Sequence, residues 1–124
     1  YFTVNAVPRS AQDLQDHRLC GYIDQLLHTD ELDYMRALGR NLRAQLKSSS
    51  IAAQLQTVLS GAALGVLPRF MAHAYPDLVP ILPDTTLTRS YWISFHNDLK
   101  RVERLRLVVA AMTGAVARDQ AIFR

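Results

Sequence analysis

Three consecutive serines stand directly before a run of small and medium side chains that is typical of a helix, in the segment KSSSIAAQLQTVLS (47–60). A serine at a helix start accepts a hydrogen bond from a backbone N–H group. The other N–H groups of the first turn, together with the helix dipole, favour a small anion or a carbonyl oxygen. Ser49 and Ser50 are therefore candidate ligand-binding residues. The same pattern fits a simpler alternative, in which one serine only caps the helix and the others face water.

A carboxylate, Asp24, follows the short apolar run RLCGYI (18–23), which is typical of a buried strand. Its oxygens could accept a hydrogen bond from the hydroxyl or amine group of a ligand. They could equally help to cap a helix that follows. Asp24 is thus a second candidate, with two interpretations left open.

The remaining reactive side chains lack the spacing that metal binding or catalysis needs. No histidine stands at ligand spacing from another histidine or from the cysteine, so we expect no metal site; the four histidines are His17, His28, His73 and His96. Cys20 lies in an apolar run, where an inert buried thiol is expected and a nucleophilic one is the alternative. The chain has no GxSxG elbow, no phosphate-binding glycine loop and no carboxylate pair for acid–base work. We therefore expect no catalytic residue, no enzyme activity and no cofactor.

An alternation of strands and helices must position these groups. Apolar runs predict strands at 18–23, 43–48, 63–67, 78–83 and 91–95. Helical patterns fall between them. A turn is expected in 7–17, with Ser10 and Asp13 as a capping box, and a helix over 28–40, with Thr29 as its N-cap and Gly39 near its end. Further helices are expected over 51–61, from Pro68, and over 98–117, where the longest one lies. This order predicts an α/β fold with a mostly parallel sheet, in which ligands bind outside the carboxyl ends of the strands.

The composition is that of one soluble domain or of a piece of a larger one. The chain has 124 residues, of which 49% are hydrophobic, and a net charge of +3. One cysteine allows no internal disulfide, no apolar stretch is long enough to span a bilayer, and no signal-peptide pattern opens the chain, so we expect a cytoplasmic location. The positive charge is concentrated from Lys100 onward, where six basic residues stand against two acidic ones. Because Phe123 is the single aromatic residue there, a solvated helix face is favoured over a nucleic-acid groove.

Four segments stand in an order and spacing typical of one protein family. They are VPRSAQDLQDHRLCGYID (7–24), SGAALGVLPRF (60–70), PDLVPILPD (76–84) and YWISFHNDLKRVERLRLVVAAM (91–112). Together they resemble the effector-binding domain of LysR-type transcriptional regulators over most of the chain. Two positions depart from the common pattern: Ala63 stands where many members have a second glycine, and Ser49 where many have an asparagine. The opening residues YFTV look locally like a strand, but the resemblance implies the tail of a helix.

The resemblance implies a periplasmic-binding-protein-like fold of type 2, of which this chain is a truncated part. Residues 1–96 would form the second lobe of the effector-binding domain, and residues 97–124 the C-terminal helix that packs on a first lobe outside the chain. A small-molecule effector would bind between the two lobes of one domain. Such domains would pair through helix 30–39 in a homodimer or tetramer. DNA would be bound only by a separate helix-turn-helix domain, and no membrane would be involved. The implied ligand-binding residues are Ser49, Ser50, Tyr22, Ile23, Asp24, Leu67 and Pro68.

The last helix carries apolar side chains on more than one face. A stripe is formed by Val102, Leu105, Val109, Met112 and Val116, and Leu107 with Val108 widens it. Such a helix needs neighbours on two sides, and we expect it to find them in a partner chain or by leaving its usual seat. The alternative function is a stand-alone solute-binding protein of the periplasmic type, which would need a signal peptide and both lobes.

Overall fold

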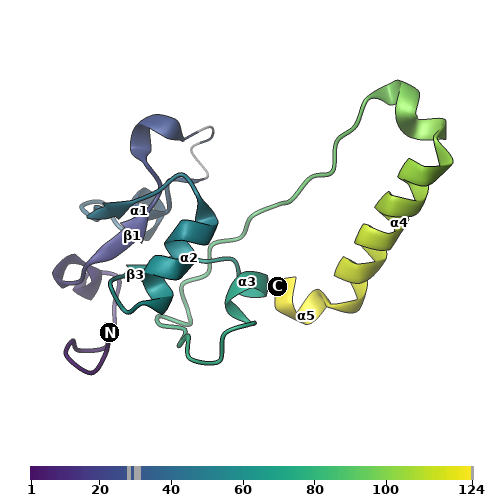
Figure 1. The fold of residues 1–124 in the computed structure, drawn as a ribbon. Helices are drawn as coiled ribbons and strands as arrows, with labels where there is room; N and C mark the ends of the chain where they lie inside the picture. Colours follow the sequence, from purple (N-terminus) through teal and green to yellow (C-terminus); the bar gives the residue numbers. More distant parts are fainter. Residues whose placement is uncertain (28, 30–31, 124) are drawn as a thin grey trace. The chain divides into compact units, whose positions relative to one another are not determined.

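The computed structural model describes residues 1–27, 29 and 32–123 (Figure 1). The chain forms two compact units, Tyr1–Leu87 and Thr88–Arg124. The assignment of residues 1–96 to a second lobe and of 97–124 to a helix that packs on a first lobe stays a prediction.

The first unit is built on a three-stranded parallel sheet. Its strands are β1 (Leu19–Gly21), β2 (Leu46–Lys47) and β3 (Leu64–Gly65), in the order β2-β1-β3. In the register, Gly21 pairs with Lys47 and Cys20 pairs with Gly65. The predicted α/β fold with a parallel sheet is therefore confirmed, and three of the predicted strands form in shorter versions.

Two hydrogen bonds to a single residue, Gln45, extend the ladder beyond the first residue of β2. The backbone N–H of Gln45 donates to the carbonyl oxygen of Leu19 at 3.0 Å. In the other direction, the backbone N–H of Leu19 donates to the side-chain oxygen Oε1 of Gln45 at 2.7 Å. A side chain thus supplies the acceptor at the start of the central strand.

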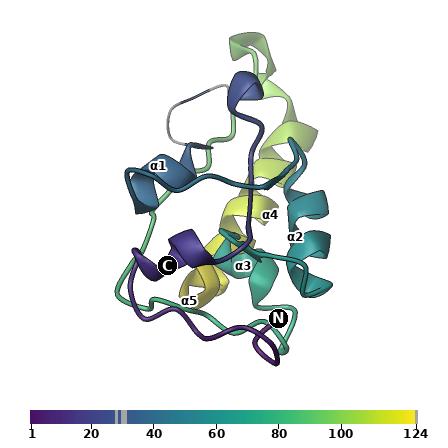
Figure 2. The ribbon, with the colours of Figure 1, turned by 90° about the vertical axis from the view of Figure 1, so that its left-hand side faces the viewer.

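Helices cover both faces of this sheet. The helical segments described in the first unit include η1 (Asp13–Asp16), η2 (Asp24–Leu26), α1 (Tyr34–Leu38), α2 (Ile51–Leu59) and α3 (Arg69–Ala72). A Cβ atom added at Gly21 would lie 3.7 Å from Met35 of α1, and one added at Gly65 would lie 2.8 Å from Val58 of α2. Cys20 pairs with Gly65, so it shares the α2 face, whereas the next residue, Gly21, points to the α1 face. In Figure 2, α1 and α2 flank the β1 segment from opposite sides.

The core of the first unit is aliphatic. Its buried residues Leu14, Leu19, Leu42 and Leu64 form one cluster, against which Tyr1, Phe2, Met35, Leu38, Ile81 and Leu82 pack. Strand β1 lies between its two neighbours and is buried along its whole length. The sheet therefore depends mainly on side chains contributed by β1, β3 and the segments that flank them.

The predicted capping box forms before η1. The backbone N–H of Asp13 donates to the Ser10 hydroxyl at 3.3 Å, and the N–H of Ser10 donates to Oδ2 of Asp13 at 3.0 Å. The N–H of Arg9 also donates to this carboxylate, and these bonds lower the pKa of Asp13. Ser10 and Asp13 therefore behave as their spacing predicts.

The helix predicted over 28–40 begins later than expected. Helix α1 starts at Tyr34, and its N-cap is Asp33, whose Oδ1 accepts a hydrogen bond from the N–H of Arg36 at 3.1 Å. Thr29 is therefore not the N-cap of this helix, although Gly39 ends it as predicted. The prediction for residues 28, 30 and 31 lies outside the described residues.

The strands predicted at 78–83 and 91–95 are wrong, because neither segment is in a strand. In the first, Pro80 and Pro83 carry no N–H group to donate to a ladder, and Leu82 has a φ of 51°, in the left-handed region. In the second, aromatic and β-branched residues are exposed, with Trp92 86% exposed. The opening residues YFTV form a turn, in which the N–H of Val4 donates to the carbonyl of Tyr1 at 3.4 Å. They are neither the strand of the local pattern nor the helix tail of the family pattern.

The second unit begins with residues 88–96, which form neither helix nor strand, and continues with η4 (Asn97–Arg101), α4 (Glu103–Arg118) and α5 (Gln120–Phe123). The long helix predicted over 98–117 is therefore divided at Val102, which has extended backbone angles. Leu107 and Val108 are 65% and 54% exposed, in agreement with an apolar surface on more than one face. Within the described residues, no helix has the length and apolar character needed to cross a membrane.

Candidate functional site

The carboxyl ends of all three strands meet at one edge of the sheet. The strands are parallel, so the segments that leave them start on the same side. These segments contain every residue predicted to bind a ligand: Tyr22, Ile23 and Asp24 after β1, Ser49 and Ser50 after β2, and Leu67 and Pro68 after β3. The fold thus brings the predicted residues to a common edge.

The serines at this edge differ in their contacts. The Ser50 hydroxyl accepts a hydrogen bond from the N–H of Ala53 at 3.4 Å and so caps α2. The Ser48 hydroxyl accepts one from the N–H of Ser50 at 3.1 Å. The Ser49 hydroxyl is exposed, and among the residues that the structure describes it has no hydrogen-bond partner. Ser50 thus fits the simpler capping interpretation, whereas the Ser49 hydroxyl is available to a ligand.

A buried glutamine holds the loop between β2 and α2 in place. Gln54 is 1% exposed, and its Nε2 donates to the carbonyl oxygen of Ser48 at 2.9 Å. Because Gln54 lies in the first turns of α2, this bond ties the helix to the end of β2. The position of the intervening Ser49 is therefore determined from both sides.

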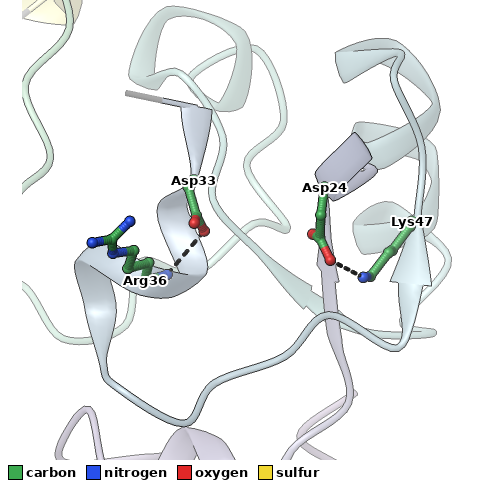
Figure 3. A network of polar contacts seen from close by, with 4 residues as sticks. All are labelled: Asp24, Asp33, Arg36 and Lys47. Atoms are coloured by element: carbon green, nitrogen blue, oxygen red, sulfur yellow. Dashed lines mark hydrogen bonds and ion pairs between the residues drawn. The ribbon is translucent and has the colours of Figure 1, made fainter. Parts of the chain in front are cut away.

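An ion pair joins the ends of β1 and β2. The Lys47 ammonium lies 2.6 Å from Oδ2 of Asp24 (Figure 3). Lys47 is the last residue of β2 and pairs in the sheet with Gly21, three residues before Asp24. The sequence pattern does not point to Lys47 as a site residue, because the two partners are 23 residues apart and no local spacing connects them. Exposed pairs of this kind contribute about 0.2–1 kcal/mol.

Asp24 also begins η2, and a small hollow lies beside it. The hollow has a volume of about 10 Å³, close to the lower limit for one water molecule. Its lining includes Tyr22 and Tyr34, whose ring centroids are 5.8 Å apart at an interplanar angle of 62°. Among the residues that the structure describes, the hollow at the end of β1 is therefore too small for a metabolite.

Leu67 and Pro68 contribute an apolar surface to the same edge. Both are half-buried. Pro68 was expected in the first turn of a helix, and it lies one position earlier, as the N-cap of α3. Its carbonyl oxygen accepts hydrogen bonds from the N–H groups of Met71 and Ala72, both at 3.0 Å. The side chains of Leu67 and Pro68 can contact a ligand by van der Waals packing only.

In a comparison with models of protein families, residues 3–117 match the LysR substrate binding domain. This match covers most of the chain. The chain belongs to the LysR substrate-binding domain family. Its fold is accordingly of the type 2 periplasmic-binding-protein class, and it is the effector-binding part of a transcriptional regulator. Neither a comparison with curated proteins nor one with solved structures gives a match.

In this LysR-type domain, the described histidines, cysteine and carboxylates form no group of three that could hold a metal ion. Cys20 is 2% exposed, and burial raises the pKa of its thiol, while a hydrogen bond with the side chain of Thr57 acts in the opposite direction. A thiol with a raised pKa is a poor nucleophile at neutral pH. The environment of Cys20 thus favours the inert interpretation.

We expect Cys20 to react with iodoacetamide at least about tenfold more slowly in the folded protein than in urea, because reaction requires local opening of β1. The folded state favours the protonated thiol, so its contribution to stability is present below the ordinary thiol pKa. That contribution is lost as the pH rises through the raised pKa of the folded state. Mass spectrometry of the alkylated peptide over time measures both rates. Equal rates would revive the alternative of a catalytic cysteine.

Proposed function

We propose that this chain senses a small-molecule effector for a bacterial LysR-type regulator, and that the effector binds at the carboxyl edge of the β2-β1-β3 sheet. One observation supports this site above others. Three parallel strands end at one edge, and beside them the Ser49 hydroxyl and the N–H groups of Ile51 and Ala52 have no hydrogen-bond partner among the described residues. These donors suit an oxygen atom of a ligand.

Residues 1–96 are then the second lobe of the effector-binding domain, and a first lobe supplies the opposite wall of the cleft. The small size of the hollow beside Asp24 supports this, since a ligand pocket normally encloses about 300–1,000 Å³. Residues 97–124 form the helix that packs on the first lobe. The exposure of Leu107 and Val108, whose burial would be favourable, supports this second assignment.

Effector binding changes the position of the two lobes and so the geometry of a homodimer or tetramer. Helix α1, within the predicted pairing region 30–39, is the candidate contact surface in this lobe. DNA is bound by a separate helix-turn-helix domain, so the two sites are coupled through the assembly by about 1–3 kcal/mol. The domain has a regulatory role without catalysis, and it works in the cytoplasm.

The variant Ser49→Ala tests the site. In the complete regulator, we expect it to weaken effector binding roughly two- to tenfold, because one neutral hydrogen bond contributes about 0.5–1.5 kcal/mol. We expect the stability of the domain to stay unchanged, since this hydroxyl is exposed and has no partner among the described residues. Titration calorimetry with the effector measures the first effect and thermal unfolding the second.

Ser90→Ala is the matched control, because Ser90 is also exposed and lies in the second unit. Ser50→Ala is less suitable, since the loss of the α2 cap would itself cost about 1 kcal/mol of stability. An unchanged dissociation constant for Ser49→Ala would remove Ser49 from the site.

A further inference from the structure

We propose that Lys47 selects effectors that carry an acidic group, and that Asp24 neutralises Lys47 until such a group displaces it. This inference rests on the proposed function, because it concerns the same edge of the sheet. It adds the chemical class of the ligand and the residue that recognises it.

The first argument is the position of the ion pair. Lys47 ends β2 directly beside the end of β1, and its Nζ lies 2.6 Å from Oδ2 of Asp24. Both side chains point toward one another across the two strand ends (Figure 3). A ligand at the carboxyl edge therefore meets an ammonium group whose charge is already balanced by the protein.

The second argument is the unequal exposure of the two partners. The Lys47 side chain is 34% exposed, whereas that of Asp24 is 66% exposed. If a ligand carboxylate takes the place of Asp24, the Asp24 carboxylate turns to water and stays well solvated. The less exposed ammonium, in contrast, keeps an anionic partner throughout. The exchange of one carboxylate for another thus leaves no charge buried without a partner.

The third argument is the nature of the neighbouring groups. The Ser49 hydroxyl, two residues beyond Lys47, can donate to a ligand oxygen. Asp33 lines the same hollow as Asp24, but its Oδ1 caps α1, where it accepts a hydrogen bond from the N–H of Arg36 (Figure 3). A cationic ligand would have to displace the less exposed Lys47 from Asp24, whereas an acidic ligand takes the place of the more exposed Asp24 and gains both Lys47 and Ser49.

Protection of Lys47 from chemical modification tests this directly. The complete protein is methylated with formaldehyde and cyanoborohydride, with benzoate, benzyltrimethylammonium or benzyl alcohol present, and each lysine is quantified by peptide mass spectrometry. We expect benzoate to protect Lys47 and the other two probes to have no effect. The chain has a single other lysine, Lys100, which serves as the internal reference. Equal protection of both lysines, protection by the cation, or no protection by benzoate overturns the proposal.

Asp24→Asn separates the displaced partner from a ligand contact. Without the competing carboxylate, we expect half-protection of Lys47 at a benzoate concentration roughly two- to fivefold lower, the factor that corresponds to an exposed ion pair. Weaker protection in this variant would mean that Asp24 itself binds the ligand, and the proposal would be wrong. Asp84→Asn, an exposed aspartate on the same unit, is the control and should change nothing.

The two proposals can fail separately. If Ser49→Ala weakens effector binding while benzoate leaves Lys47 unprotected, the carboxyl edge is the site but Lys47 does not select acids. If benzoate protects Lys47 while Ser49→Ala leaves effector binding unchanged, the acid site stands and the assignment of Ser49 fails.

Discussion

Leu19→Ala is expected to lower the free energy of unfolding of the first unit by about 2–5 kcal/mol. Leu19 is 4% exposed and belongs to the buried cluster with Leu14, Leu42 and Leu64. Alanine keeps the two hydrogen bonds that the backbone of residue 19 makes to Gln45, so the loss comes from the removed side chain and the cavity it leaves. Because small domains have only about 5–15 kcal/mol of stability, this is a large part of the total.

Urea unfolding followed by far-ultraviolet circular dichroism measures the change. Val79→Ala is the control, because Val79 is 67% exposed in the same unit and its truncation should cost less than about 0.5 kcal/mol. A Leu19→Ala variant as stable as this control would show that the cluster around β1 does not hold the unit together.

Gly65→Ala is expected to cost about 1–3 kcal/mol, because β3 and α2 approach too closely for another atom. A Cβ atom at residue 65 would lie 2.8 Å from Cγ2 of Val58 and 3.7 Å from Cβ of Cys20. The β-branched side chain of Val58 is stiff and cannot move aside easily. Either α2 shifts away from the sheet or the strand bends.

A double-mutant cycle isolates this contact. Val58→Ala removes the clashing methyl group, so we expect Gly65→Ala to be much less harmful in that background, with a coupling of about 1 kcal/mol or more in urea unfolding. Gly114→Ala is the control for the intrinsic effect of the substitution. A Cβ there would meet only the flexible Arg118 side chain at 3.7 Å, and alanine in a helix stabilises by about 0.5–1 kcal/mol. Additive effects at residues 58 and 65 would contradict the packing argument.

The sequence predicted best those features that depend on neighbours in the chain. The capping roles of Ser10 and Asp13 follow from local spacing, and each residue forms a hydrogen bond over three residues. The predicted start of α1 is wrong, because both Thr29 and Asp33 are residue types that cap helices well. Local pattern alone does not decide between two such caps.

Strand prediction succeeded only where a partner strand exists. The runs around β1, β2 and β3 pair with one another, whereas the equally apolar runs 78–83 and 91–95 do not. Strand pairing is a long-range property, since the edge that a strand joins is supplied by a distant segment. Propensity therefore identifies a segment that is able to form a strand, but not whether it does.

The candidate site divides in the same way. Its location followed from parallel topology, which places the ends of the strands at one edge. The different contacts of Ser49 and Ser50 could not be predicted from the sequence. The two residues are identical and adjacent, so their contacts depend on the exact residue at which α2 begins. The Asp24–Lys47 pair depends on the register of β1 against β2, which the sequence pattern leaves open.

The hydrogen bond from the N–H of Leu19 to the side chain of Gln45 helps to fix the register of β2 against β1, in addition to the burial of apolar side chains. A slip of β2 by two positions would keep the same side chains facing the same layers, so burial alone would penalise it weakly. The slip would, however, carry the amide of Gln45 away from the N–H of Leu19 and leave that donor without its acceptor. Gln45 therefore disfavours a mispaired sheet that burial alone would tolerate.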